Sequence, residues 1–211
     1  AKFLEECGFS RVILERALTL DDIKKIRQAT NVELECFIHG AICVGYSGRC
    51  FLSRTTSQRS GNRGECSQPC RLPYDLKDSA GRKILTGKHL LSVRDLDLSK
   101  SLEELIMAGV SSFKIEGRLK DVRYIKNIVA YYRQLLDNII SRHSDLKRAS
   151  IGESSIDFTP NPAKSFTRGA SSYMLYGKCG DVASFDTPKA VGEYIGRIES
   201  VTRNGFRLDT T

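Results

Sequence analysis

The sequence has no tryptophan, only two methionines and three histidines, and no long hydrophobic run. No apolar stretch approaches the roughly 18–20 residues that a membrane-spanning helix needs, so we expect no membrane partner. Neither a Ser–His–Asp arrangement nor an H-E-x-x-H zinc helix is recognisable, which leaves the common hydrolase signatures without support. With 211 residues, 40% hydrophobic and 27% charged, the chain has the composition of a soluble protein with one sizeable domain, or a domain with a small appendage.

Acidic residues are fewer than basic ones, 25 against 33, and the net charge of +8 favours a polyanionic partner. No basic-then-apolar leader precedes the first element, so we expect a cytoplasmic protein whose seven cysteines are reduced thiols or metal ligands. Cys7, Cys36 and Cys179 fit the pattern of ordinary small hydrophobic residues. Residues 1–7 read as a helix already under way, and we therefore expect a piece of a longer protein.

Four further cysteines lie close together in a polar segment rich in Gly, Ser, Thr and Arg. Cys43, Cys50, Cys66 and Cys70 are separated by gaps of six, fifteen and three residues. A structural zinc site usually shows two short C-x2-4-C pairs, and only the last pair here is short. Four thiolates around an iron–sulfur cluster accept wider spacing. The spacing alone favours an iron–sulfur cluster and leaves zinc, or structural or redox cysteines, as open alternatives.

Strand and helix patterns alternate along the first two thirds of the chain, which predicts a parallel sheet, either open or closed into a barrel. We expect a barrel-type domain over residues 1–143 with the cysteine loop at 39–75, a linker at 144–165, and a small β-module at 166–211 that is cut short. The expected helices cover residues 1–7, a segment capped by Thr19 or Asp21, and residues 101–109 and 119–141, and the expected strands cover residues 11–14, 32–38, 88–93, 110–118, 170–176, 191–201 and 204–209.

Chemistry in such sheets gathers where strands end, and both the cysteine loop and the segment KIEGR lie at such ends. Alternation along a strand would point Lys114, Glu116 and Arg118 to one face, where they could hold a dicarboxylic acid or position a base, or form a salt-bridge layer. His39 ends another strand and is a candidate proton donor or a structural histidine.

The cysteine loop is also rich in arginine, which suits phosphate groups and stacks on bases. Tyr46 and Phe51 could offer stacking faces to RNA. Pairing with barrel carboxylates, or shielding of cluster sulfurs, is the alternative use of these arginines. The arginines in or beside the loop are Arg49, Arg54, Arg59, Arg63 and Arg71.

Several segments together resemble the collagenase-like peptidase family U32. The ECFIHGAIC stretch and the GRCFLS stretch after it resemble the hallmark of that family, and the later segments match its further motifs. The segments are 35–43, 48–53, GECSQPCR at 64–71, FKIEGR at 113–118, SFTRG at 165–169 and the stretch 191–201.

The resemblance implies a fold, a cofactor and a reaction. The fold would be the C-terminal part of a TIM-like (β/α) barrel followed by a small β-module. The cofactor would be a 4Fe–4S cluster on Cys43, Cys50, Cys66 and Cys70. Some relatives take the fourth ligand from a later position, which here is Asp97, so Cys70 becomes the natural fourth ligand.

The reaction implied by the resemblance is oxygen-independent hydroxylation of an RNA base, in ribosomal RNA rather than tRNA, with prephenate as a co-substrate. His39 and Glu116 would be the catalytic residues, and Arg49, Arg63, Arg71, Lys114 and Arg118 would bind substrate. Two alternatives stay open at this point: a collagenase-like protease, which is the historical name of the family, and a zinc-stapled RNA-binding module.

Overall fold

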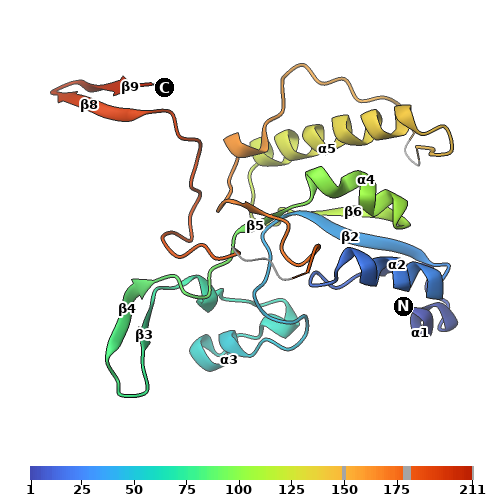
Figure 1. Ribbon diagram of the computed structural model, residues 1–211, viewed down its shortest axis with the longest axis horizontal. Helices are drawn as coiled ribbons and strands as arrows, with labels where there is room; N and C mark the ends of the chain where they lie inside the picture. The colour runs from blue at the N-terminus through green and yellow to red at the C-terminus, as the bar shows by residue number, and fades with distance from the viewer. Residues whose placement is uncertain (149–150, 178–181, 211) are drawn as a thin grey trace.

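The computed structural model describes residues 1–148, 151–177 and 182–210, and shows a mixed sheet with helices packed on it (Figure 1). Strand β2 (Glu33–Gly40) is central. It pairs in parallel with β1 (Arg11–Ile13) and with β6 (Val110–Glu116), as the strand–helix alternation predicts. The other two strands of the sheet run the opposite way. Strand β5 (Asp95–Asp97) pairs antiparallel with the end of β2, and β7 (Ala170–Ser171) pairs in parallel with β5.

The helices begin and end at residues whose chemistry favours those positions. Helix α2 (Leu20–Ala29) starts at Thr19, whose hydroxyl accepts from Asp22 N while the Asp22 carboxylate accepts from Thr19 N. Helix α5 (Val122–Arg142) starts at Asp121, whose carboxylate accepts from Tyr124 N. The remaining helices of the sheet domain are α1 (Lys2–Glu6), α4 (Leu102–Met107) and the 3-10 turns η3 (Ser99–Ser101) and η4 (Pro162–Lys164).

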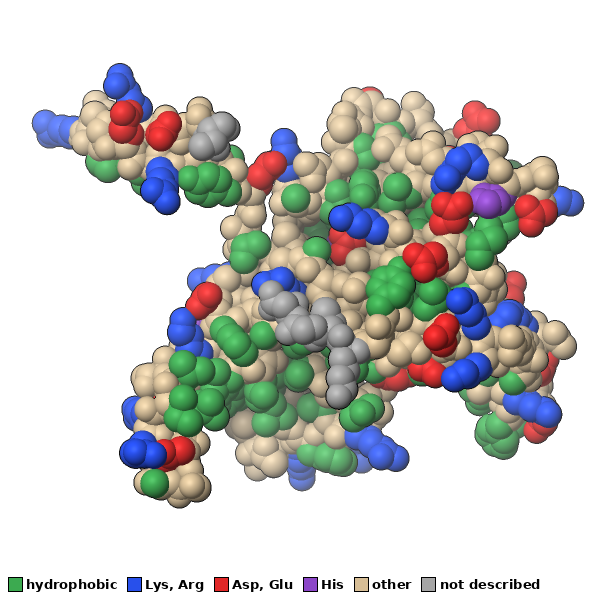
Figure 2. All heavy atoms as spheres, in the orientation of Figure 1, with side chains coloured by type: hydrophobic (Ala, Val, Ile, Leu, Met, Phe, Trp, Pro, Cys, Tyr) green, Lys and Arg blue, Asp and Glu red, His purple; other side chains and the backbone are tan. Residues whose placement is uncertain are grey.

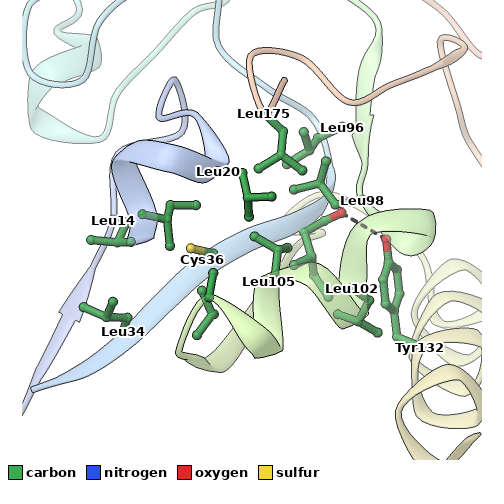
Figure 3. Packing of buried hydrophobic residues seen from close by; sticks show 14 of the residues in the cluster. Leu14, Leu20, Leu34, Cys36, Leu96, Leu98, Leu102, Leu105, Tyr132 and Leu175 are labelled. Atoms are coloured by element: carbon green, nitrogen blue, oxygen red, sulfur yellow. Dashed lines mark hydrogen bonds between the residues drawn. The ribbon is translucent and has the colours of Figure 1, made fainter. Parts of the chain in front are cut away.

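The hydrophobic core lies between β2 and the helices (Figure 3). Leu34, Ile38, Leu102, Leu105 and Ile128 are almost completely buried. These residues come from β2, α4 and α5, which lie far apart in the sequence and pack together in one core cluster. Cys36 lies in the same cluster, and burial raises the pKa of its thiol to about 12, which makes it a packing residue as predicted. Cys7 is exposed instead, and Cys179 lies outside the described residues.

Two hairpins project from this body (Figures 1 and 2). Strands β3 (Tyr74–Lys77) and β4 (Lys83–Lys88) form one hairpin after the cysteine loop. Strands β8 (Arg197–Thr202) and β9 (Gly205–Asp209) form the other, around the predicted Asn204–Gly205 turn. All residues of β8 are exposed. The strands of the predicted β-module therefore belong to two different sheets. Strand β7 is part of the main sheet, while β8 and β9 pair only with each other.

The strand predicted at 88–93 is wrong. Strand β4 ends at Lys88, and its partner is β3. The Asp78 carboxylate accepts hydrogen bonds from Ala80 N and Arg82 N, which stabilises the turn of the β3–β4 hairpin. Strand β4 therefore pairs within this hairpin and not with the main sheet. The sheet strand of this region is the three-residue β5, two residues further on. Closure of the sheet into a TIM-like barrel stays a prediction. Within the described part, no helix is both long enough and apolar enough to cross a membrane.

Candidate metal centre and RNA-facing loop

The cysteine loop starts where β2 ends against β6. Gly40 has φ +104 and lies so close to the Glu116 carbonyl that a Cβ there would overlap its oxygen. Only glycine combines this backbone conformation with such a close approach. The chain therefore leaves the sheet at a fixed point and direction, next to the C-terminal end of β6. The loop contains α3 (Leu52–Ser57) and two 3-10 turns, η1 (Gly61–Arg63) and η2 (Pro69–Arg71).

These short turns bring the four predicted ligands together. Burial raises the pKa of the Cys70 thiol and Arg71 lowers it, while Cys43, Cys66 and Cys50 each raise it further. The other three thiols are thus within electrostatic reach of Cys70. The backbone of Gly45 lies between two of them, because a Cβ there would be 3.8 Å from both Cys43 Sγ and Cys50 Sγ.

Polar groups of the loop point at the sulfur atoms. Gly45 N donates to Cys43 Sγ at 3.4 Å, and Gln68 N donates to Cys66 Sγ at 3.3 Å. The buried Ser53 hydroxyl donates to Cys66 Sγ at 3.7 Å. Hydrogen bonds of this kind stabilise thiolate over thiol and set the redox potential of a bound cluster.

The donor set consists of four thiols that could hold a metal ion or a cluster. Four sulfurs around a single zinc would lie about 3.8 Å apart, given Zn–S bonds of about 2.3 Å. Among the described residues, no group of three or more Cys, His, Asp or Glu side chains is close enough to hold one metal ion. The N–H and O–H donors at Cys43 Sγ and Cys66 Sγ are of the kind that sulfur ligands accept in iron–sulfur proteins, and Cys43, Cys50, Cys66 and Cys70 are the residues that would hold such a cluster.

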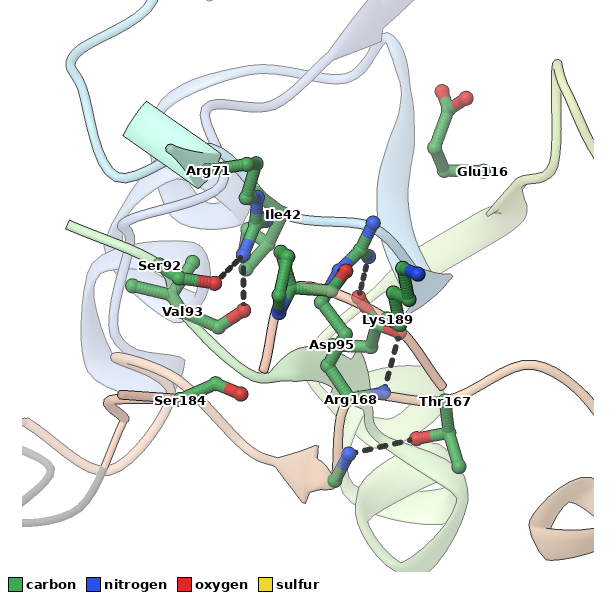
Figure 4. Close-up of polar contacts among 12 residues, drawn as sticks. Ile42, Arg71, Ser92, Val93, Asp95, Glu116, Thr167, Arg168, Ser184 and Lys189 are labelled. Carbon is green, nitrogen blue, oxygen red and sulfur yellow. Dashed lines mark hydrogen bonds and ion pairs between the residues drawn. The ribbon is translucent and has the colours of Figure 1, made fainter. Parts of the chain in front are cut away.

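Arg71 fastens this loop to the sheet domain (Figure 4). Its Nη1 donates to Ser92 Oγ at 2.9 Å and to Val93 O at 2.5 Å, and its Nη2 donates to Ile42 O at 3.0 Å. The residue is largely removed from solvent, and burial lowers the pKa of its guanidinium. These three contacts join η2, which contains Cys70, to Ile42 and to the Ser92–Val93 segment.

The other four arginines of the loop face solvent. The exposed aromatic side chains of Tyr46, 75% exposed, and Phe51, 66% exposed, accompany them. Between Cys43 and Arg71 the sequence has a single acid, Glu65, and it is also exposed. The loop therefore presents exposed guanidinium groups and ring faces on one segment of chain, which are the two kinds of group that contact RNA phosphates and bases. Among these guanidinium groups, that of Arg54 also donates to Gln58 O at 3.3 Å. The exposed arginines are Arg49, Arg54, Arg59 and Arg63.

His39 lies in a buried polar cluster beside the loop. It is 7% exposed, and its Nδ1 is 3.3 Å from the Tyr132 hydroxyl of α5. That hydroxyl is 2.9 Å from Ile38 O (Figure 3) and 3.2 Å from Asp97 Oδ1. Burial and the neighbouring Asp97 raise the pKa of Tyr132, so the hydroxyl keeps its proton and donates it to one of these oxygens. Its own oxygen then accepts from His39 Nδ1–H, which leaves the lone pair on Nε2.

The pH dependence of folding provides a test of this neutral histidine. Burial lowers the pKa of His39 below 6.5 in the folded state, against the opposing effect of Asp97 and Asp95. The unfolded state then binds more protons at low pH than the folded state. The contribution of neutral His39 to the unfolding free energy is therefore fully present above its unfolded-state pKa, and it is lost as pH falls toward its folded-state pKa. As pH falls from about 7.5 to 5.5 we expect the unfolding free energy to decrease, because His39 takes up a proton on unfolding. Urea unfolding at both pH values should show a smaller loss of unfolding free energy for His39→Gln than for the original chain. Equal losses would contradict a neutral His39.

The KIEGR segment is arranged differently from the prediction. Strand β6 ends at Glu116, so the alternation does not extend to Arg118, which lies in the following turn and is exposed. Lys114 is directed at the Phe37 ring, with its ammonium 5.0 Å from the ring centroid. The Glu116 carboxylate accepts from Arg118 N at 3.2 Å. A dicarboxylic acid such as prephenate at Lys114, Glu116 and Arg118 stays a prediction.

Sequence reasoning missed two participants of the site. Tyr132 appeared only as one apolar position of a long helix, since its spacing shows burial but not the hydroxyl contacts. Asp97 was considered only as a substitute for a cysteine. The alternation of β5 gave no signal of its own, because the strand is three residues long.

Comparisons with known proteins show which proteins the chain is similar to. The model of peptidase family U32 matches residues 1–182. The 23S rRNA 5-hydroxycytidine C2501 synthase of Escherichia coli is 50% identical over the whole chain, which covers 32% of that protein. The tRNA hydroxylation protein P1 of Bacillus subtilis is 40% identical over 64% of the chain and 34% of its own length. A collagenase of Porphyromonas gingivalis is 36% identical over 50% of the chain and 29% of its own length.

The chain thus spans about a third of the length of the curated relatives that it matches. No solved structure matches it.

Proposed function

This chain belongs to peptidase family U32, and on that premise we propose that it is the cluster-binding part of an enzyme that hydroxylates a base of ribosomal RNA. The observation that carries the proposal is the loop itself. Four thiols converge there, and four exposed arginines with two exposed aromatic rings lie on the same segment. The name of the Escherichia coli relative specifies a cytidine of 23S rRNA, which makes a cytidine the first base to examine.

Replacing C–H by C–OH on a base is a two-electron oxidation. With water as the source of the oxygen atom, two electrons and two protons are released, and an electron acceptor separate from this chain must take up the electrons. A 4Fe–4S cluster on Cys43, Cys50, Cys66 and Cys70 would supply one-electron redox chemistry. The residues of the chain then have separate tasks. The exposed arginines bind phosphates, Tyr46 and Phe51 stack an unpaired base, and His39 Nε2 accepts a proton.

Support for the larger architecture comes from the sheet. The parallel pairing of β1, β2 and β6, and the position of the cysteine loop after β2, suit the C-terminal part of a TIM-like barrel whose active site is at the C-terminal ends of its strands. The rest of that barrel would be supplied by a longer chain. A cytoplasmic location, where ribosomal RNA is found, is part of the same proposal.

RNA binding is the partner prediction that the loop makes. Each of Arg49→Ala and Arg63→Ala should weaken binding to a ribosomal RNA fragment and reduce the dependence of log K on log salt by about one. The cause is the loss of one phosphate contact and of the counterion release that accompanies it. Fluorescence anisotropy of labelled RNA across a salt series measures both quantities.

Two further variants make this measurement selective. Arg123→Ala removes an exposed arginine of α5, outside the loop, and should leave affinity and salt slope unchanged. Arg71→Ala should lower thermal stability, because it removes the contacts to Ser92, Val93 and Ile42. Equal weakening by Arg63→Ala and Arg123→Ala would show that net charge alone, and not the loop, binds RNA.

The protease alternative has less support in this site. A nucleophilic Ser or Cys must lie within hydrogen-bond reach of its base. In the described residues, the hydrogen-bond neighbour of the His39 ring is Tyr132, and no Ser or Cys contacts it. Gelatin hydrolysis by the purified protein, lost in His39→Gln, would revive the alternative. The hydroxylation proposal is tested by mass spectrometry of ribosomal RNA nucleosides, where cells without the protein should lack one hydroxylated nucleoside.

A further inference from the structure

A group of cationic side chains lies outside the cysteine loop, where segments far apart in the sequence meet. The turn between β6 and α5 carries Lys120, and the segment before β7 carries Phe166 and Arg168. The Lys120 ammonium lies 3.0 Å from the Phe166 ring centroid and 5.6 Å from that of Tyr124. The Arg168 guanidinium lies 4.7 Å from the same Phe166 ring. Two cations therefore share one aromatic side chain, which brings them close to each other.

The acidic groups nearby are already occupied. Asp95 accepts from Arg168 at both oxygens, from Nη1 at 2.8 Å and from the backbone N at 3.1 Å (Figure 4). Asp121 accepts from Tyr124 N at the start of α5. No carboxylate of the described residues forms an ion pair with Lys120. Burial and the positive charges of Arg168 and Arg71 lower the pKa of Lys120, as expected for a cation with too few anions around it.

Free donors at this place remain open to a ligand. Arg168 uses Nε on Pro188 O and Nη1 on Asp95, and its Nη2 has no hydrogen-bond partner among the described residues. Every buried side-chain nitrogen or oxygen in the described part has a partner. The Nη2 of Arg168 and the ammonium of Lys120 must therefore be reached by solvent, even though Arg168 is 9% exposed.

The charged groups with the largest influence on the pKa of Lys120 are Arg168, Asp95, Arg71 and Asp121. Arg71 lies between the two regions, since it interacts with Cys70 and Cys43 as well as with Arg168. An anion at Lys120 would therefore lie beside the cysteine loop.

We propose that Lys120 and Arg168 form a binding site for an oxyanion, a carboxylate or a phosphate group, against the Phe166 ring. Two cationic heads with unused N–H donors can each donate to one oxygen of the ligand, as a planar guanidinium and an ammonium do at known anion sites. The site would hold its ligand next to the cysteine loop. It stands independently of RNA hydroxylation, since neither a cluster nor a reaction is needed for binding.

Calorimetric titration of the full chain tests the site, with inorganic phosphate and malonate as probes at constant ionic strength in chloride. We expect saturable binding of at least one probe, and about tenfold weaker binding by Lys120→Ala, because one charge-assisted contact is lost. Lys120→Arg should recover most of the affinity. Lys126→Ala, which removes an exposed lysine of the neighbouring helix α5, is the matched control and should bind like the original chain.

The two probes separate two sources of the ligand. Preference for phosphate would indicate an RNA backbone phosphate, and preference for malonate would indicate a small carboxylic acid. Either preference supports the site. Absence of saturable binding, or equal affinities of Lys120→Ala and Lys126→Ala, would overturn it.

A second measurement avoids substitutions that could disturb folding. Acetic anhydride acetylates accessible lysine side chains through their unprotonated amine form and releases acetate, and mass spectrometry reports each position. Phosphate or malonate should slow modification of Lys120 in the original chain and leave Lys126 unaffected. Equal protection of both lysines would contradict the proposal. Because neither experiment involves RNA modification, failure here and failure of the proposed function are distinguishable.

Discussion

Replacing Cys70 by serine is expected to remove most of the iron from the protein. After anaerobic purification, the unaltered chain should be brown and contain about four iron atoms per molecule. Serine presents a hydroxyl that does not ionise near neutral pH, so the cluster would keep only three thiolates. Burial raises the pKa of the Cys70 thiol, and Arg71 opposes that rise, so Cys70 lies in a partly desolvated place beside a positive charge. Iron analysis and absorption spectra measure the loss.

Two other cysteine variants complete this experiment. Cys66→Ser alters an exposed position of the loop and should lose iron as Cys70→Ser does, even if the latter folds poorly. Cys7→Ser alters an exposed cysteine of the N-terminal segment and should keep its iron. One zinc per chain with no iron, or full iron content in Cys70→Ser, would contradict the cluster assignment.

Replacing Asp95 by alanine should cause the largest loss of stability in the sheet domain. Asp95 and Arg168 form an ion pair at 2.8 Å, with side chains 7% and 9% exposed. The pair joins β5 to the segment before β7, 73 residues later in the chain. Without Asp95 the guanidinium stays buried with no anion, which costs about 3–5 kcal/mol. Urea unfolding of the full chain should show this as a lower midpoint.

The companion variants identify the cause of the loss. Asp95→Ala combined with Arg168→Met removes both charges and should recover part of the stability. Asp186→Ala breaks an exposed pair with Lys88 and should change the midpoint little. If the double variant were as unstable as Asp95→Ala, lost packing and not the unpaired charge would be responsible.

The regular elements of the fold could be predicted where one periodicity dominated. The three- and four-residue spacing of α5 and the alternation of β2 each record one buried face, and both elements formed close to the predicted bounds. The region between residues 74 and 97 could not be predicted in the same way. Its outcome depends on the turn at Asp78 and on a three-residue strand, β5, whose partners lie far away in sequence.

The grouping of the cysteines could be predicted, because their short spacing in the sequence limits how far apart they can lie. Four cysteines within one loop must lie near each other, and the structure places them within electrostatic reach. The use of Arg71 as a structural clamp was not predictable, because its acceptors Ser92, Val93 and Ile42 come from segments that only folding brings together. The His39–Tyr132 contact was not predictable either, because it joins residues 93 positions apart that only folding brings together.

The central claim is that the cysteine loop serves hydroxylation of ribosomal RNA. It is tested most directly in cells that lack the protein and are then supplied with either the original gene or the Cys70→Ser variant. Mass spectrometry of ribosomal RNA nucleosides should show a hydroxylated cytidine restored by the original gene and absent with Cys70→Ser. Equal restoration by both genes, or an unchanged nucleoside profile in cells without the protein, would contradict the account.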